Sequence, residues 1–188
     1  RSLMLKAKSL YHLIVYSILF IIVLISSFTF IIINNTHDEL QEKIYTLKTD
    51  YTNNQKELIK NHVNYIINFI DYYNETFKDK KSQAEIQKEI LQTIEKLRVN
   101  QNPNEYIFIY DFNGKLIQDA VSKNNIGENF YNLKDINGKE VIKELITTSQ
   151  KKHGGYVEYV WYKPEISKQT NKISYSLSYN KWNWTIGK

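Results

Sequence analysis

The spacing of apolar residues separates a helical first half of the chain from a second half in which apolar and polar residues alternate. An uncharged run from Leu13 to Ile33 is long enough to cross about 30 Å of hydrocarbon as a helix. The small-residue cleavage site of a signal peptide does not follow it, and a buried core helix is rarely so long and uninterrupted. We therefore predict an uncleaved transmembrane helix at residues 13–33.

Apolar residues after this run recur at spacings of three, four and seven, the period of an amphipathic helix. The pattern predicts one long helix over residues 36–78 that continues from the membrane and changes from a narrow stripe to a broader one near Leu58. Because a narrow stripe often pairs with a copy of itself, we expect a homodimer through this helix, with packing against its own domain as the alternative. The narrow stripe consists of Leu40, Ile44, Leu47, Tyr51 and Leu58.

A shorter helix is predicted over residues 82–98. Ser82 and Glu85, three residues apart, have the pattern of a capping box at its start. Pro103 ends the helical pattern, because proline has no N–H to donate and biases the preceding residue toward extended geometry. The apolar face of this helix consists of Ile86, Ile90, Ile94 and Leu97.

From Tyr106 onward the apolar period changes to two, which is typical of strands. Asn113 and Gly114 supply a turn between the first two strands, and a helical segment, "VIKELITTSQKK", precedes the last three. The fold class is therefore α+β, with a five-stranded antiparallel sheet over residues 105–187 and helices to one side. The strand segments are "EYIFIYD", "KLIQD", "YVEYVWYK", "ISYSLSY" and "WNWTIG".

The distribution of charge predicts how the chain is oriented in the membrane. It carries 25 Lys and Arg against 20 Asp and Glu, a net charge of +5, but Arg1, Lys6 and Lys8 precede every acid. The positive-inside rule then leaves residues 1–12 in the cytoplasm and residues 34–188 outside it. Without those three cations the excess of Lys and Arg over Asp and Glu falls to two, which argues against a nucleic-acid binder. The lack of cysteine excludes disulfides and thiolate metal sites.

Catalysis is not predicted for this region. The four histidines have no i, i+4 partner of the kind that binds zinc, and the glycine-rich loops that hold phosphates are missing. The sequence gives no sign of a catalytic carboxylate pair. We expect no catalytic residue, no metal and no cofactor here, and leave enzymatic activity to an output domain, such as a kinase, downstream.

Tyrosines, tryptophans and cations concentrate in the alternating half. By the two-residue period, Tyr159, Trp161 and Lys163 share one strand face. On the following strand we expect the tyrosine face, with Tyr175, to join them. A pocket for a small carboxylate needs apolar walls, hydroxyl donors and one or two cations, and these rows supply all three. The alternative is an aromatic core from which Lys163 extends to solvent.

Five ordered motifs in this half resemble the single Cache domains (sCache_2-like) of bacterial extracytoplasmic sensors, which occur in chemoreceptors and sensor histidine kinases. The resemblance implies a PAS-like sheet preceded by a long helix and one transmembrane helix, and a domain that binds small organic acids. The motifs are "NEYIFIYDFNGKLIQD", "IGENFYNLKDINGKEVIKELI", "GGYVEYVWYKP", "KISYSLSY" and "WNWTIG".

The resemblance also implies which residues line the pocket. Arg98, in "LRVNQNPNEY", matches an arginine that often precedes the first strand, and with Lys163 it would bind a carboxylate. Where relatives commonly show His-Pro after the first hairpin, this chain has Asp119 and Ala120, and an acid there would repel a carboxylate unless it is paired. The candidate ligand-binding residues are Arg98, Tyr106, Phe108, Asp119, Tyr159, Trp161, Lys163 and Tyr175.

These observations predict the ligand-sensing domain of a signal-transduction receptor, anchored in the inner membrane with its sensor in the periplasm. It would bind a small organic acid and signal across the membrane to a chemotaxis or two-component output. The ending "IGK", where relatives show "IGTG", leads us to expect a fragment of a longer receptor. The alternatives are a tethered module that recognises a periplasmic protein, and a sensor for an amine or a neutral molecule.

Overall fold

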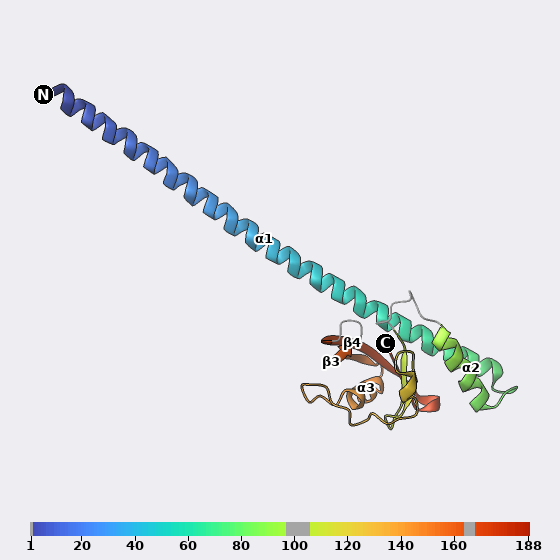
Figure 1. The fold of residues 1–188 in the computed structure, drawn as a ribbon. Helices are drawn as coiled ribbons and strands as arrows, with labels where there is room; N and C mark the ends of the chain where they lie inside the picture. Colours follow the sequence, from blue (N-terminus) through green and yellow to red (C-terminus); the bar gives the residue numbers. More distant parts are fainter. Residues whose placement is uncertain (1, 97–105, 164–167) are drawn as a thin grey trace. The chain divides into compact units, whose positions relative to one another are not determined.

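The computed structural model describes residues 2–96, 106–163 and 168–188. The chain divides into two compact units, with the boundary between Thr52 and Asn53. A single helix, α1 (Ser2–Phe77), supplies the described part of the first unit and the beginning of the second (Figure 1).

The first unit contains the apolar run. Of the described helices, α1 is long and apolar enough to cross a membrane by length and composition, and its most apolar window has no buried residues. Ser17, Ser27 and Thr29 each donate a hydrogen bond of 2.8 Å to a backbone carbonyl three or four residues earlier. These hydroxyls are therefore satisfied within the helix, as a hydrocarbon environment requires.

The second unit is built around one five-stranded sheet with the order β2-β1-β5-β4-β3. Every neighbouring pair of strands is antiparallel, which confirms the predicted fold class. The strands are β1 (Phe108–Asp111), β2 (Leu116–Asp119), β3 (Gly155–Lys163), β4 (Lys168–Tyr179) and β5 (Trp184–Gly187); the helices are the end of α1, α2 (Gln83–Lys96), α3 (Val141–Ser149) and the 3₁₀ turns η2 (Lys123–Asn125) and η4 (Asn180–Trp182).

Helices lie against both faces of the sheet, so the expectation that they lie to one side is wrong. Successive strand residues point to opposite faces: Ile109 packs with α1 and α2, whereas Phe108 and Tyr110 pack with α3. The α1 and α2 side is closed by two isoleucine-rich rows, one on each helix. The core residues that α1 and α2 contribute are Val63, Ile66, Ile70, Ile86, Ile90 and Ile94.

The start of α2 has the predicted capping box. The backbone N–H of Glu85 donates to the Ser82 hydroxyl at 3.3 Å, and the backbone N–H of Ser82 donates to the Glu85 carboxylate at 2.9 Å. The reciprocal bonds satisfy two donors that a helix start otherwise leaves open. They fix where the chain turns back after α1, and so place α2 beside it on the sheet.

Polar contacts tie the strands that follow α3, and the turns beside them, to α1. On β3, the Tyr156 hydroxyl donates to the backbone carbonyl of Lys56 at 2.8 Å. In η4, the Lys181 ammonium lies 2.7 Å from Asp71 and 2.9 Å from Glu75. Tyr156 pairs with Tyr175 on β4, and Lys181 follows the last residue of β4, Tyr179. Both contacts therefore hold the carboxyl-terminal half of β4 to the helix.

Gly154 lets the chain pass closely over β4 as it enters β3. Its φ of +62° is in the left-handed region, and a Cβ placed there would lie 2.2 Å from the backbone oxygen of Ser176. A side chain could fit only if one of the two backbones moved. Gly138 has a similar φ of +82°, but nothing lies within 4 Å of its Cβ position.

These two glycines allow backbone strain and steric overlap to be separated. Gly138→Ala should cost about 1 kcal/mol in the free energy of unfolding, because alanine strains at positive φ. Gly154→Ala should cost about 3 kcal/mol or more, because overlap with β4 adds to the strain. Thermal unfolding of the full chain in detergent micelles measures both. Equal losses would show that Gly154 is needed for its φ alone.

Candidate ligand-binding site

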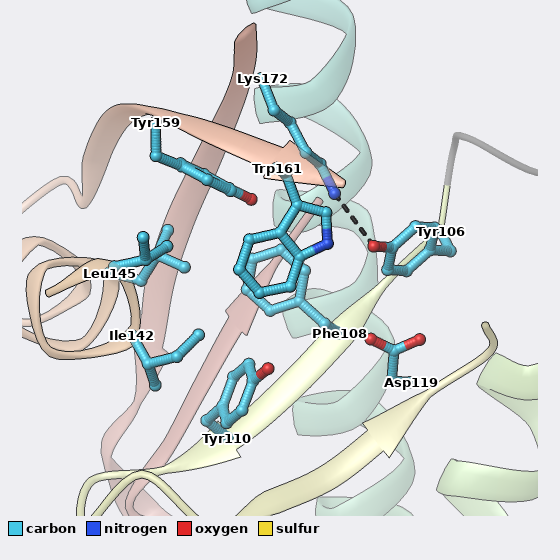
Figure 2. Close-up of a pocket in the computed structure, with 10 residues that line it drawn as sticks. Tyr106, Phe108, Tyr110, Asp119, Ile142, Leu145, Tyr159, Trp161 and Lys172 are labelled. Carbon is cyan, nitrogen blue, oxygen red and sulfur yellow. Dashed lines mark hydrogen bonds between the residues drawn. The ribbon is translucent and has the colours of Figure 1, made fainter. Parts of the chain in front are cut away.

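A cavity lies between the sheet and α3, with about 250 Å³ of empty space including the part open to solvent. Each strand except β5 contributes to its lining, and α3 forms the opposite wall (Figure 2). Tyr106, Trp161 and Lys172 remain partly exposed, whereas the other side chains that line the cavity are buried. The lining residues are Tyr106, Phe108, Tyr110, Asp119, Val141, Ile142, Leu145, Tyr159, Trp161 and Lys172.

Strand register brings the charged groups into this cavity. Asp119 on β2 is the direct partner of Phe108 on β1, and Lys172 on β4 is the direct partner of Tyr159 on β3. Direct partners in an antiparallel pair point to the same face. Both charges therefore face α3, in a space whose other walls are aromatic and aliphatic.

Gly187 makes room for the cavity at its sheet side. It stands opposite Phe108 in the β1–β5 pair, and a Cβ at this position would lie 2.3 Å from the end of the Phe108 ring. The ring can thus lie over β5 instead of filling the space beneath α3. The glycine of the "WNWTIG" segment is explained by this approach.

The Lys172 ammonium lies among aromatic rings. It donates a hydrogen bond of 3.1 Å to the Tyr106 hydroxyl and lies 4.4 Å from the centre of the Tyr106 ring, a distance at which the ring face attracts a cation. Burial lowers the pKa of Lys172 from 10.5 to about 8, and attraction by Asp119 opposes that shift. At pH 7 the group still carries its proton, in surroundings that supply few hydrogen-bond acceptors.

Asp119 is buried, and one of its two carboxylate oxygens accepts hydrogen bonds. Its Oδ1 atom accepts hydrogen bonds from the backbone N–H groups of Val121 at 2.7 Å and Ser122 at 2.9 Å. These bonds hold the carboxylate at the end of β2. Figure 2 shows it on the same side of the cavity as Lys172, with the Tyr106 hydroxyl between them.

Tyrosine hydroxyls in the cavity are uncharged hydrogen-bond donors. The hydroxyls of Tyr159 and Ser174 are 3.0 Å apart and share a hydrogen bond. Burial raises the pKa of Tyr159 to about 12, and burial with the nearby Asp119 charge also raises the pKa of Tyr106 and Tyr110. These hydroxyls therefore stay protonated at neutral pH and can donate to a bound molecule.

The cavity brings together part of the predicted residue set: Tyr106, Phe108, Asp119, Tyr159 and Trp161 line it. Their role in binding a ligand stays a prediction.

One member of the predicted set, Tyr175, does not line the described cavity, and for two others the structure gives no side-chain position. Tyr175 lies on the opposite sheet face, where its hydroxyl donates to the His153 carbonyl and its ring meets Tyr156 edge-on at 5.1 Å. Arg98 lies outside the described residues. Lys163 ends β3, paired with Lys168, and its side chain also lies outside the described part of the chain.

The cation that the structure does place in the cavity, Lys172, was not in the predicted set. The tyrosine face of β4 was expected to line the pocket, but the face with Lys172 and Ser174 does so. A signal was available: pairing the "VEYVW" and "KISYS" segments in register sets Lys172 opposite Tyr159. The length of the hairpin loop, which determines that register, could not be read from the pattern.

Comparison with known proteins decides the family. Residues 51–188 match the family described as Single Cache domain 2 (sCache_2). The chain belongs to this family. The predicted resemblance is confirmed, over a range that contains the whole sheet and the described cavity.

Two relatives of this Cache domain are signalling proteins. A sensor histidine kinase, MctS of Rhizobium johnstonii, is 38% identical over 82 residues, 44% of this chain and 18% of the relative. A methyl-accepting chemotaxis protein, McpP of Pseudomonas putida, is 27% identical over 106 residues, 56% of this chain and 19% of the relative. The chain thus spans about a fifth of the length of these relatives, and it contains a Cache sensor domain of the kind found in chemoreceptors and histidine kinases.

A solved structure supports the fold assignment. A Cache chemosensory domain, studied for carboxylic acid recognition, superposes with a TM-score of 0.65 at 25% identity, covering 73% of this chain and 93% of that one. The likeness supports the fold class that the sequence predicted.

Replacing Lys172 by methionine should stabilise the empty Cache domain. Methionine keeps an unbranched apolar stem and removes an ammonium that burial disfavours, so the free energy of unfolding at pH 7 should rise by roughly 0.5–2 kcal/mol. The gain should shrink as the pH rises from about 8 to 10.5, because lysine in the unfolded chain then also loses its proton. Thermal unfolding of the full chain in detergent micelles measures this.

Lys168→Met is the matched control, since Lys168 is on the same strand but exposed. Its effect should stay within about 0.5 kcal/mol. Destabilisation by Lys172→Met would contradict the conclusion that the ammonium is held in unfavourable surroundings.

Proposed function

We propose that this Cache domain binds a small molecule with a carboxylate group in the cavity beneath α3, and that binding is signalled across a membrane through α1. The observation that carries the proposal is the Lys172 ammonium, which faces the cavity and has the Tyr106 hydroxyl as its hydrogen-bond partner. Keeping a lysine there lowers its pKa, a cost that a bound anion would offset.

The remaining lining supports a small ligand. The Tyr106, Tyr110 and Tyr159 hydroxyls can donate to carboxylate oxygens, and Trp161 forms an aromatic wall that meets Tyr159 edge-on at 5.6 Å. The similarity to a domain studied for carboxylic acid recognition supports the same ligand class.

The apolar window of α1 supports a membrane anchor. With the three early cations on the cytoplasmic side, the sheet and its cavity would face the periplasm, where they could sample imported solutes. The kinase and chemotaxis relatives support either output for the whole receptor.

We propose that α1 pairs with α1 of a second copy. The heptad spacing of Leu58, Tyr65 and Tyr72 continues the narrow stripe of the first unit, with Asn61 and Asn68 at intervening positions. All five side chains are exposed, Tyr65 by 69% and Tyr72 by 71%. This face points away from the buried row of α1, so a partner helix could cover it without disturbing the core.

Two contacts would carry a change in the cavity to this helix. Tyr156 and Glu158 on β3 contact Lys56, and Lys181 after β4 contacts Asp71. The same strands present Tyr159 and Lys172 to the cavity on their other face. A ligand that moves β3 relative to β4 would therefore act on α1 directly.

The proposed ligand class is tested by calorimetric titration of the full chain in detergent micelles with organic and amino acids of two to four carbon atoms. At least one should bind, and Lys172→Met should weaken its binding at least tenfold, because the charge-assisted hydrogen bond is lost. Between pH 7 and pH 9 the affinity should fall about tenfold, as the fraction of protonated Lys172 falls through its pKa of about 8.

Lys168→Met again serves as control and should bind like the unmodified chain. The proposal fails if no acid binds, or if binding survives unchanged in Lys172→Met.

Pairing of α1 is tested by disulfide trapping, which is clean because the chain has no cysteine. The exposed face that contains Leu58, Tyr65 and Tyr72 would be the seam between the two helices. Tyr65→Cys should form covalent dimers rapidly in mild oxidant, since equivalent seam positions of two parallel helices face each other at disulfide distance. Lys60→Cys, exposed but off the seam, should form them at least tenfold more slowly. Equal rates for the two variants, read from non-reducing gels, would argue against the seam.

A further inference from the structure

The cavity contains two opposite charges that are not paired with each other. Lys172 and Asp119 are the charged side chains among the described residues that line it. The ammonium bonds to Tyr106, and one carboxylate oxygen bonds to the β2 end. Their mutual attraction acts through space, without a direct ion pair between these two described side chains. The ammonium and the second carboxylate oxygen of Asp119 can therefore each form a further hydrogen bond.

Charge balance limits what that partner can be. With Lys172 protonated and Asp119 ionised, the described lining is neutral. A simple carboxylate would pair with Lys172 and leave the site with one net negative charge beside a buried acid. A simple amine would leave one net positive charge. A molecule that carries both charges pairs with each residue and leaves the site neutral.

The arrangement of the two residues also limits the ligand. Figure 2 shows Lys172 and Asp119 on one side of the cavity, with the Tyr106 hydroxyl between them, and Ile142 and Leu145 on the other side. A ligand that reaches both charges must carry its ammonium and carboxylate close together at one end. The other end must be short and apolar to meet α3.

We infer that the ligand of this cavity is a small zwitterionic 2-amino acid, whose carboxylate is held by Lys172 and whose ammonium is held by Asp119. This inference rests on the proposed function and specifies its ligand class. The tyrosine hydroxyls complete the carboxylate site, and the apolar wall of α3 limits the side chain to a few atoms.

The test compares L-alanine with three compounds that each lack one of its charged groups: L-lactate, propionate and ethylamine. Each is titrated into the full chain in detergent micelles at pH 7 by calorimetry. L-alanine should bind at least tenfold more tightly than the other three, because only it satisfies both charges. The comparison varies one substituent at a time and needs no altered protein.

The variant Asp119→Asn then tests whether Asp119 binds the ammonium group of the ligand. Asparagine keeps a carbonyl oxygen for the Val121 and Ser122 N–H groups and removes the charge. Alanine binding should weaken at least tenfold, while propionate binding should stay equal or improve, because the repelling charge is gone.

Asp111→Asn is the matched control. Asp111 likewise accepts two backbone N–H bonds, from Asn113 and Lys115, but in the β1–β2 turn away from the cavity. It should leave the order of the four affinities unchanged.

The inference is overturned if lactate or propionate binds as tightly as alanine, or if Asp119→Asn leaves the ratio of alanine to propionate affinity unchanged. In either case binding that depends on Lys172 would still support the proposed function. If none of the four compounds binds and the acid panel is also negative, the proposed function fails and the inference fails with it.

Discussion

The alternation of side chains along a single sheet layer is the constraint on which the rest of this structure depends. Each strand residue faces either the α1 and α2 core or the α3 cavity, so one strand serves two environments. On β4, Lys172 and Ser174 face α3 whereas Tyr175 and Tyr179 face α1. A slip of one residue would exchange these sets and place an ammonium in the isoleucine-rich core. The close passage of Gly154 over the Ser176 backbone fits this register.

Patterns that depend on neighbours in sequence could be predicted. Helical stripes, the Ser82–Glu85 box and the Asn113–Gly114 turn follow from local spacing, and Gly114 has the expected positive φ of 87°. The strand segments could be predicted because their apolar residues recur every two positions. Rows such as Tyr159 with Trp161 were recognisable because both residues are on one strand.

Features that depend on pairing between strands could not be predicted in the same way. Period alone says that β4 has a serine face and a tyrosine face, but not which one faces the cavity, and the tyrosines looked better suited to a pocket. Lys172 is therefore visible only once β3 and β4 are aligned. The second helical layer was missed for a related reason: α3 lies between strands in sequence, and nothing local states which sheet face it covers.

The contacts at Lys56 and Asp71 restrict how α1 can move. Lys56 and Asp71 are 15 residues apart, roughly 22 Å along the axis, and about four turns later they return to nearly the same side. Rolling the helix about its own axis would have to break both contacts at once. Tilting it about one contact can leave that contact in place. The geometry therefore favours a change of inclination over a change of rotation as the movement that the sheet can impose on α1.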